Sequence, residues 1–334
     1  MAISDSDSLN FLIIGAGAVG SIFAWRLQHA GNNVDIVCRS NYEAVLQNGF
    51  QISSFQFGPT TFKPNRVHKS LVDASLSKVV YDYILVCTKS LPNIHSPADV
   101  LEGIDLGSAA IVLIQNGIGI EVPFYKRFPG NALISSITYI DTKQVESGVI
   151  EHGDSADLSF GIYDPDNRFS EESTDHTLLL LQKALLEGGI KPKINRQIQI
   201  ERWYKVVWNA SFNPISVVSG ASNTVQLLSD PRMEALIIRA MREIISVAET
   251  YLGTSLSPEI DSSEIPERYI AMTRKRPEPV FPSMMVDYVN KRPMEHQVIL
   301  KAPIDVAKSL NIDVPVLESI YAILVHLENK QLNQ

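Results

Sequence analysis

The chain has 334 residues, of which 45% are hydrophobic and 20% charged, and this composition is typical of a soluble globular protein of about two domains. Its formal net charge of −8 argues against non-specific binding to nucleic acid, although a locally basic cleft for an anionic cofactor is compatible with it. The polar stretch 1–10 lacks the basic and apolar regions of a secretory signal, and no apolar run is long enough to span a membrane.

A glycine-rich loop near the N-terminus follows the apolar run 11–14. It precedes an amphipathic segment ending at His29 and a second apolar run, 34–38, which predicts a strand, a tight turn, a helix and a parallel strand. The first glycine permits the turn, the second lets a pyrophosphate approach the backbone, and the third lets helix and strand pack closely. The loop therefore predicts a dinucleotide cofactor. The residues predicted to contact this cofactor are Gly15, Ala16, Gly17, Ala18, Val19 and Gly20.

Arg39 ends the second strand, where an NAD-binding unit usually has an acidic residue that accepts a hydrogen bond from the ribose 2′-hydroxyl. A guanidinium cannot accept that bond, but it can pair with a 2′-phosphate, so the sequence favours NADP(H) over NAD or FAD. The alternative is a surface arginine without this role.

Short strand and helix patterns alternate along the next part of the chain, as expected of an α/β domain. The predicted strands are 50–57, 81–88, 108–114, 132–140, 148–152, 158–162 and 190–194, the predicted helices are 42–48 and 177–186, and 164–175 is a predicted surface loop. From residue 199 to 326, helix-length patterns replace strands. We therefore predict a cofactor-binding domain over 1–196 and a helical substrate-binding and catalytic domain over 197–334.

Two polar residues follow predicted buried strands. Lys89 comes after the strand at 81–88, and ligands of open α/β sheets bind beyond the carboxyl ends of the strands. It is therefore a candidate for contact with a cofactor phosphate or ribose, and a solvated loop lysine is the alternative. Asn116 follows the strand at 108–114, where its amide can reach a nicotinamide or can simply belong to a turn.

Lys205, Asn209 and Asn213 recur at i, i+4 and i+8, so their side chains share one face of a predicted helix. Such a stripe is often only the solvated side of a helix. Asparagine is a poor helix former, however, and two of them in line with a lysine favour a functional role.

The rest of the C-terminal half contains amphipathic and polar stretches. The predicted helices are 231–252, 301–310 and 316–328, and a loop rich in serine, proline and charge is predicted at 253–282. Ser283 follows Pro282 at a helix start, where its hydroxyl can cap the helix. Pro293 suits the first position of another helix, which would place Glu295 in a first turn. No His, Cys and carboxylate cluster has ligand spacing, so we expect no metal.

In combination, these motifs resemble the ketopantoate reductase family, the NADP-dependent 2-dehydropantoate 2-reductases. The segments that carry the resemblance are GAGAVG at 15–20, CTKS at 87–90, QNGIG at 115–119, the K-x-x-x-N-x-x-x-N-P element at 205–214, and PSMMVD at 282–287 with the downstream Glu295. The resemblance implies an N-terminal Rossmann-like α/β domain with a parallel-rich sheet. It also implies an all-α C-terminal domain similar to that of 6-phosphogluconate dehydrogenase.

The resemblance also implies roles for single residues. By similarity, Lys205 is the catalytic lysine and Glu295 the active-site glutamate. Asn116 contacts both cofactor and substrate, and Arg39 and Lys89 bind the cofactor. The predicted substrate contacts are Asn209, Asn213 and Ser283.

Two departures from the family pattern bear on the substrate. Met294-Glu295-His296 replaces the usual Thr-Glu-Ile, and a Lys-Arg-Pro stretch replaces the usual Gly-Arg before it. The expected activity is NADPH-dependent reduction of 2-dehydropantoate to (R)-pantoate in pantothenate biosynthesis, with Lys205 as general acid. The alternatives are a reductase of another 2-oxo acid or ketone, and a non-catalytic NADP-binding sensor.

The expected partner is a small 2-oxo acid, and neither nucleic acid nor a membrane is expected. A homodimer through the helical domain is a further hypothesis. Cys38 and Cys87 are the only cysteines, and each ends a predicted buried strand. This usage predicts a reducing, cytoplasmic location.

Overall fold

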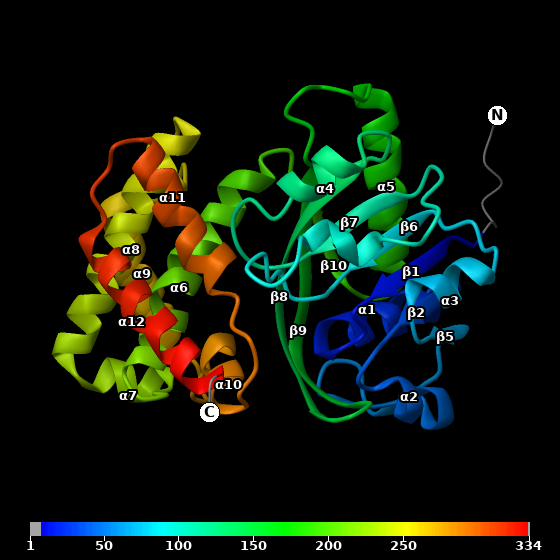
Figure 1. Ribbon diagram of the computed structural model, residues 1–334, viewed down its shortest axis with the longest axis horizontal. Coiled ribbons are helices and arrows are strands. Elements are labelled where there is room, and N and C mark those ends of the chain that lie inside the picture. Colours follow the sequence, from blue (N-terminus) through cyan, green and yellow to red (C-terminus); the bar gives the residue numbers. More distant parts are fainter. Residues whose placement is uncertain (1–7, 333–334) are drawn as a thin grey trace. The chain divides into compact units, whose positions relative to one another are not determined.

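The computed structural model describes residues 8–332, so most of the polar stretch 1–10 lies outside the described residues (Figure 1). The chain divides into two compact units, each considered by itself. The first comprises the chain up to Lys89 together with Ser96–Gln115 and Ile120–Ile198. The second comprises Ser90–His95, Asn116–Gly119 and the chain from Gln199 onward.

A ten-stranded sheet forms the centre of the first unit, with strand order β4-β3-β9-β8-β7-β6-β1-β2-β5 and with β10 paired to β9. The strands are β1 Asn10–Ile14, β2 Asn33–Val37, β3 Phe50–Ser54, β4 Thr60–Phe62, β5 Arg66–His68, β6 Tyr83–Val86, β7 Ala110–Ile114, β8 Leu133–Glu146, β9 Val149–Ile162 and β10 Lys191–Ile194. The ladder from β5 through β2, β1, β6 and β7 to β8 is parallel, whereas β8–β9 and β3–β4 are antiparallel. The predicted parallel-rich sheet is confirmed.

The helices of the first unit pack on this sheet. They are α1 Ala18–His29, α2 Tyr42–Asn48, α3 Leu71–Leu76, the 3₁₀ helix Pro97–Leu101, α4 Val122–Arg127 and α5 Glu171–Glu187. Phe23 of α1 and Leu181 of α5 share one core with Phe11 and Ile36 of the neighbouring strands β1 and β2. The strands β6 and β7 are buried at every position, as expected of parallel strands covered on both faces.

β8 and β9 form one long antiparallel hairpin, where the sequence predicted three short strands at 132–140, 148–152 and 158–162. Each has 14 residues, and the pairing runs from Ile134 opposite Ile162 to Glu146 opposite Val149. Beyond Ile137, β8 alternates between partly buried and exposed positions. Its polar residues interrupt the apolar pattern, which is why the predicted strand ended too early.

The helix α5 begins at Glu171, so the prediction of a surface loop over 164–175 is wrong for its last five residues. Ser170 caps the helix, because its hydroxyl accepts a hydrogen bond from Ser173 N at 3.3 Å. Glu171 and Glu172 fill the first turn, where the helix dipole stabilises acidic side chains. The polar character that indicated a loop is that of a helix N-terminus.

The regular elements of the second unit within residues 8–332 are all helices, which confirms the expected all-α fold (Figure 1). Its elements are α6 Ile198–Val218, α7 Thr224–Ser229, α8 Pro231–Leu252, the 3₁₀ turn Ser262–Glu264, α9 Ile265–Arg274, α10 Ser283–Val289, the π-helix Gln297–Lys301, α11 Ala302–Ser309 and α12 Pro315–Leu332. α8 packs against α7, α9, α11 and α12. Its buried face includes Ile237, Met241, Ile244 and Ala248, spaced by three or four residues.

Two predictions for this unit are wrong. The loop predicted at 253–282 contains α9, whose buried residues Ile265, Tyr269 and Ile270 have helical spacing amid serine, proline and charge. Pro293 does not open a helix, because residues 292–295 are irregular and the helical stretch begins at His296. In residues 8–332, no helix is both long and apolar enough to cross a membrane.

Candidate active site

The glycine loop joins β1 to α1 in the first unit. Gly15 has φ +88°, and a Cβ there would lie 2.7 Å from Thr88 Cγ2. A Cβ on Gly20 would lie 2.5 Å from the Gly15 carbonyl oxygen. A Cβ on Gly17 would meet nothing nearer than Gln144 Oε1 at 4.0 Å. Gly15 and Gly20 are therefore required by packing, whereas a Cβ on Gly17 would make only an ordinary van der Waals contact.

The N-terminus of α1 fits an anionic group. Gly17 is the N-cap residue, so no side chain caps the first backbone N–H groups of this 12-residue helix. These groups, and the lack of any close contact at Gly17, suit the close approach of a pyrophosphate. The loop thus has the shape and the donors of a dinucleotide site.

The predicted cofactor-binding residues follow three neighbouring strands of the sheet. Gly15 follows β1, Arg39 comes shortly after β2, and Lys89 comes shortly after β6, with β1 lying between the other two. Because these strands are parallel, their carboxyl ends meet at one edge of the sheet. Arg39 and Lys89 are both exposed. Asn41 donates to Ala16 O at 2.9 Å and ties the stretch after β2 to the glycine loop.

Lys205 lies on α6 in the second unit, and its ammonium donates to Asn116 Oδ1 at 3.0 Å. The lysine side chain is half-buried. The pKa of Lys205 is lowered to about 8, first by burial and then by the nearby positive charge of Arg202, while Glu295 and Glu201 act in the opposite direction. The sequence predicted both residues separately, and the structure brings them into contact.

Asn213 and Ser283 also meet, although the two are 70 residues apart. Asn213 Oδ1 accepts hydrogen bonds from Ser283 Oγ at 3.3 Å and from Met284 N at 3.1 Å. The hydroxyl of Ser283 therefore does not cap its own helix, and α10 has no side-chain cap from its N-cap residue, Pro282. Asn209 lies one turn before Asn213 on α6 and is buried as well.

Glu295 is buried and accepts a hydrogen bond from Ser90 N at 2.9 Å. The residues on either side of it contact Glu328 of α12. Met294 N donates to Glu328 Oε1 at 2.9 Å, and His296 Nε2 lies 2.6 Å from Glu328 Oε2. Burial raises the pKa of Glu328, but the hydrogen bonds from His296 and Met294 N outweigh this effect and leave the pKa lowered.

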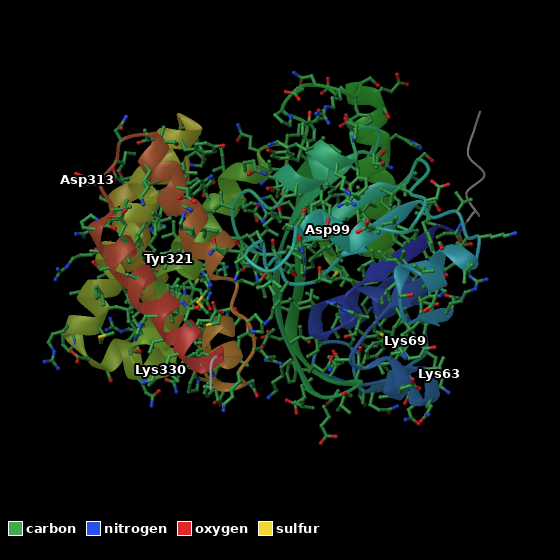
Figure 2. The ribbon with its side chains drawn as sticks, in the orientation of Figure 1. Lys63, Lys69, Asp99, Asp313, Tyr321 and Lys330 are labelled. Carbon is green, nitrogen blue, oxygen red and sulfur yellow. The ribbon has the colours of Figure 1, made fainter. Side chains whose placement is uncertain are left out.

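The structure adds residues to the site that the sequence analysis missed. His296, which the sequence singled out only as a departure from the family pattern, is one of them, and its ring centroid lies 5.7 Å from that of Tyr321. Tyr321 belongs to α12 and is labelled in Figure 2. Arg202 is another, because its guanidinium donates to Gly117 O at 3.0 Å. Its position three residues before Lys205, on the same helical face, was a signal that the sequence analysis did not use. Within residues 8–332, no group of three or more His, Cys, Asp or Glu side chains has an arrangement that could hold a metal ion.

Known proteins with a similar sequence and fold show which family has this architecture. The family model described as ketopantoate reductase PanE/ApbA matches residues 11–165, and its C-terminal counterpart matches residues 197–328. The crystal structure of 2-dehydropantoate 2-reductase from Methylococcus capsulatus has 34% sequence identity and a TM-score of 0.82, covering 97% of this chain and 98% of that one.

Two further proteins extend the comparison. The meiotically up-regulated gene 72 protein of Schizosaccharomyces pombe is 28% identical over 99% of this chain, which spans 58% of that protein's length. The ternary structure of D-mandelate dehydrogenase with NADH and anilino(oxo)acetate has a TM-score of 0.82 and covers 97% of this chain and 99% of that one. At 18% identity, this second likeness shows a shared fold.

Proposed function

The chain belongs to the ketopantoate reductase family of oxidoreductases, and on that basis we propose that it catalyses the NADPH-dependent reduction of 2-dehydropantoate to (R)-pantoate in pantothenate biosynthesis. The observation that carries the proposal is the contact of Lys205 Nζ with Asn116 Oδ1 at 3.0 Å, made by a lysine whose pKa is lowered to about 8. A reductase of this kind needs a proton donor beside its nicotinamide site. A protein that only senses the cofactor does not.

The cofactor would be held by the first unit. A bound nicotinamide dinucleotide supplies the two electrons of the reduction. The GAGAVG loop would bind its pyrophosphate, because Gly17 leaves room and the N-terminus of α1 offers uncapped N–H groups. Arg39 would pair with a 2′-phosphate, and Lys89 would reach a phosphate or ribose beyond β6. The position of Arg39 after β2 favours NADPH over NADH.

Lys205 would act as the general acid. Reduction of a ketone places negative charge on its oxygen, and an ammonium within hydrogen-bonding reach stabilises that charge and then supplies the proton. With a pKa of about 8, roughly ten lysines are protonated for each neutral one at pH 7. The group is therefore charged when needed, yet it releases its proton more readily than an ordinary lysine. Asn116 would orient the ammonium through its Oδ1 atom.

The substrate contacts would come from the amide groups of α6 and from Glu295. Asn213 Oδ1 accepts bonds from Ser283 and Met284, so its amide NH₂ is the part that would donate to a substrate carboxylate. Asn209 would provide a second amide from the same face. Glu295 would accept a hydrogen bond from the terminal hydroxyl of ketopantoate, and Ser90 N fixes the carboxylate beforehand. A site that bonds a hydroxyl discriminates against substrates that lack it.

The test is NADPH oxidation, followed at 340 nm, with ketopantoate and with a panel of 2-oxo acids that lack the terminal hydroxyl. We expect the highest kcat/KM with ketopantoate. Lys205→Ala should retain NADPH binding while kcat falls by about two orders of magnitude or more, the scale of a lost general acid. Preference for an unhydroxylated acid would assign a different substrate, and wild-type turnover by Lys205→Ala would contradict the mechanism.

A further inference from the structure

Arg202 is a charged residue with almost no solvent exposure. It lies on α6 one turn before Lys205, and its relative exposure is 2%. Arginine is among the residues least often fully buried unless it is paired, so its burial here calls for a partner. One partner is the main chain of another segment, because Nη1 donates to Gly117 O at 3.0 Å. This bond joins residues that are 85 positions apart.

The segment Asn116–Gly119 is held on a second side as well. Ile118 N donates to Val298 O at 2.8 Å, and Val298 lies within the π-helical turn Gln297–Lys301 that follows Glu295. Gly117 has φ +99°, and a Cβ there would lie 2.5 Å from Val298 Cβ, so the backbone fits this place only as glycine. Arg202 on one side and Val298 on the other therefore fix the carbonyl and the path of the chain at residue 117.

We propose that Arg202 is a positioning residue for the reaction: its hydrogen bond to Gly117 O holds Asn116 where the Asn116 side chain accepts a bond from Lys205. The two bonds form adjacent links between α6 and one short segment, Arg202 to Gly117 O and Lys205 to Asn116 Oδ1, each of 3.0 Å. If the first link is lost, the second loses its support. An error of about 1 Å in such a contact can cost about a hundredfold in rate.

The charge of Arg202 has a second effect on the same lysine. A guanidinium stays protonated throughout the physiological pH range, so a permanent positive charge lies one helical turn from the ammonium. After burial, this charge is the next cause that lowers the pKa of Lys205. The opposing charges are those of Glu295 and Glu201. Removal of the guanidinium should therefore move the titration of Lys205 to higher pH.

The experiment uses the full chain with Arg202→Met, which removes the donor and the charge, and Arg202→Lys, which restores both in a different shape. Arg242→Met is the matched control, because Arg242 is exposed on α8 and pairs with Glu267. Two quantities are measured for each variant: kcat with NADPH and ketopantoate, and the titration midpoint of Lys205 by NMR of ¹³C-methylated lysines. The Lys205 signal is assigned by its loss in Lys205→Arg.

We expect Arg202→Met to lower kcat by about tenfold or more and to raise the Lys205 midpoint by roughly half a pH unit or more. Arg202→Lys should return the midpoint to the wild-type value and recover much of kcat, and Arg242→Met should change neither quantity. Wild-type values of both in folded Arg202→Met would overturn the proposal. If that variant does not fold, the neutral Arg202→Gln replaces it, and an unchanged midpoint there has the same meaning.

The inference rests on the proposed function for the identity of the proton donor, and the two can fail separately. A wild-type protein that reduces no 2-oxo acid contradicts the proposed function. The NMR midpoint needs no substrate, so it still shows whether Arg202 acts on Lys205.

Discussion

Alanine at Gly20 and alanine at Gly17 separate the packing role of the glycine loop from its cofactor role. At Gly20 the new Cβ would lie 2.5 Å from Gly15 O and 3.2 Å from Cys87 Cβ, so atoms must shift. Overpacking of this kind costs about 1–3 kcal/mol. The gain in helix propensity from glycine to alanine, about 1 kcal/mol, offsets part of that cost. Because the close contact is with a main-chain oxygen, the cost is at the upper end of that range, and we expect Gly20→Ala to lower the free energy of unfolding by about 2 kcal/mol.

Gly17→Ala should behave in the opposite way. Its Cβ meets nothing closer than 4.0 Å, so the free energy of unfolding should change by no more than about 0.5 kcal/mol. The methyl group would occupy the space needed by the pyrophosphate, and NADPH affinity should fall about tenfold or more, equivalent to about 1.4 kcal/mol. Urea unfolding followed by circular dichroism and NADPH titration by fluorescence provide both quantities. Unchanged NADPH affinity in Gly17→Ala would refute the proposed role of the loop, and a stability loss equal to that of Gly20→Ala would refute the packing argument.

Other predictions concern single side chains. Because the ammonium of Lys205 is lost as pH rises through its pKa of about 8, kcat for ketone reduction should fall above that pH. A kcat profile that stays flat to about pH 10 would exclude Lys205 as the proton donor. Arg39→Ala should raise the Kd for NADPH much more than the Kd for NADH, and equal changes in a binding titration would mean that Arg39 does not contact the 2′-phosphate. Glu295→Ala should lower kcat/KM for ketopantoate more than for an unhydroxylated 2-oxo acid, and equal losses in steady-state assays would remove its role in specificity. Glu328→Ala leaves two buried partners unsatisfied and should lower the free energy of unfolding by about 2–3 kcal/mol in urea titrations. The control is Glu318→Ala, an exposed acid on the same helix, which should cost about 0.5 kcal/mol or less. Similar losses in the two variants would contradict this account.

The elements that the sequence predicted well are those in which burial follows a local period. α8 has its predicted bounds because its buried residues recur every three or four positions between the N-cap Asp230 and the left-handed Gly253. The strands β6 and β7 are continuous apolar runs. The prediction failed for β8 beyond Ile137, where pairing with β9 rather than apolar content extends the strand. Such pairing depends on residues far along the chain, which no short window contains.

The candidate site likewise has one part that the sequence predicts and another that it does not. The common face of Lys205 and Asn209 follows from their spacing in one helix, so the sequence is sufficient to predict it. The bond from Arg202 to Gly117 O spans 85 positions, and the bond from Ser90 N to Glu295 spans 205. No periodicity connects residues at such separations, and the acceptor of the first bond is a main-chain carbonyl, which carries no information in the residue type. These contacts can be found only in the folded chain.

The Met294-Glu295-His296 stretch, which replaces the usual Thr-Glu-Ile of the family, makes contacts with a residue on another helix. From the sequence, these residues brought the substrate into question because they flank Glu295, the predicted active-site glutamate. In the structure, the two flanking residues bind Glu328, one through its main-chain N–H and the other through its imidazole. Glu295 itself is held by a different donor, Ser90 N. The departure at His296 therefore has a partner on α12, whereas the bond of Met294 uses a main-chain N–H that does not depend on the methionine side chain.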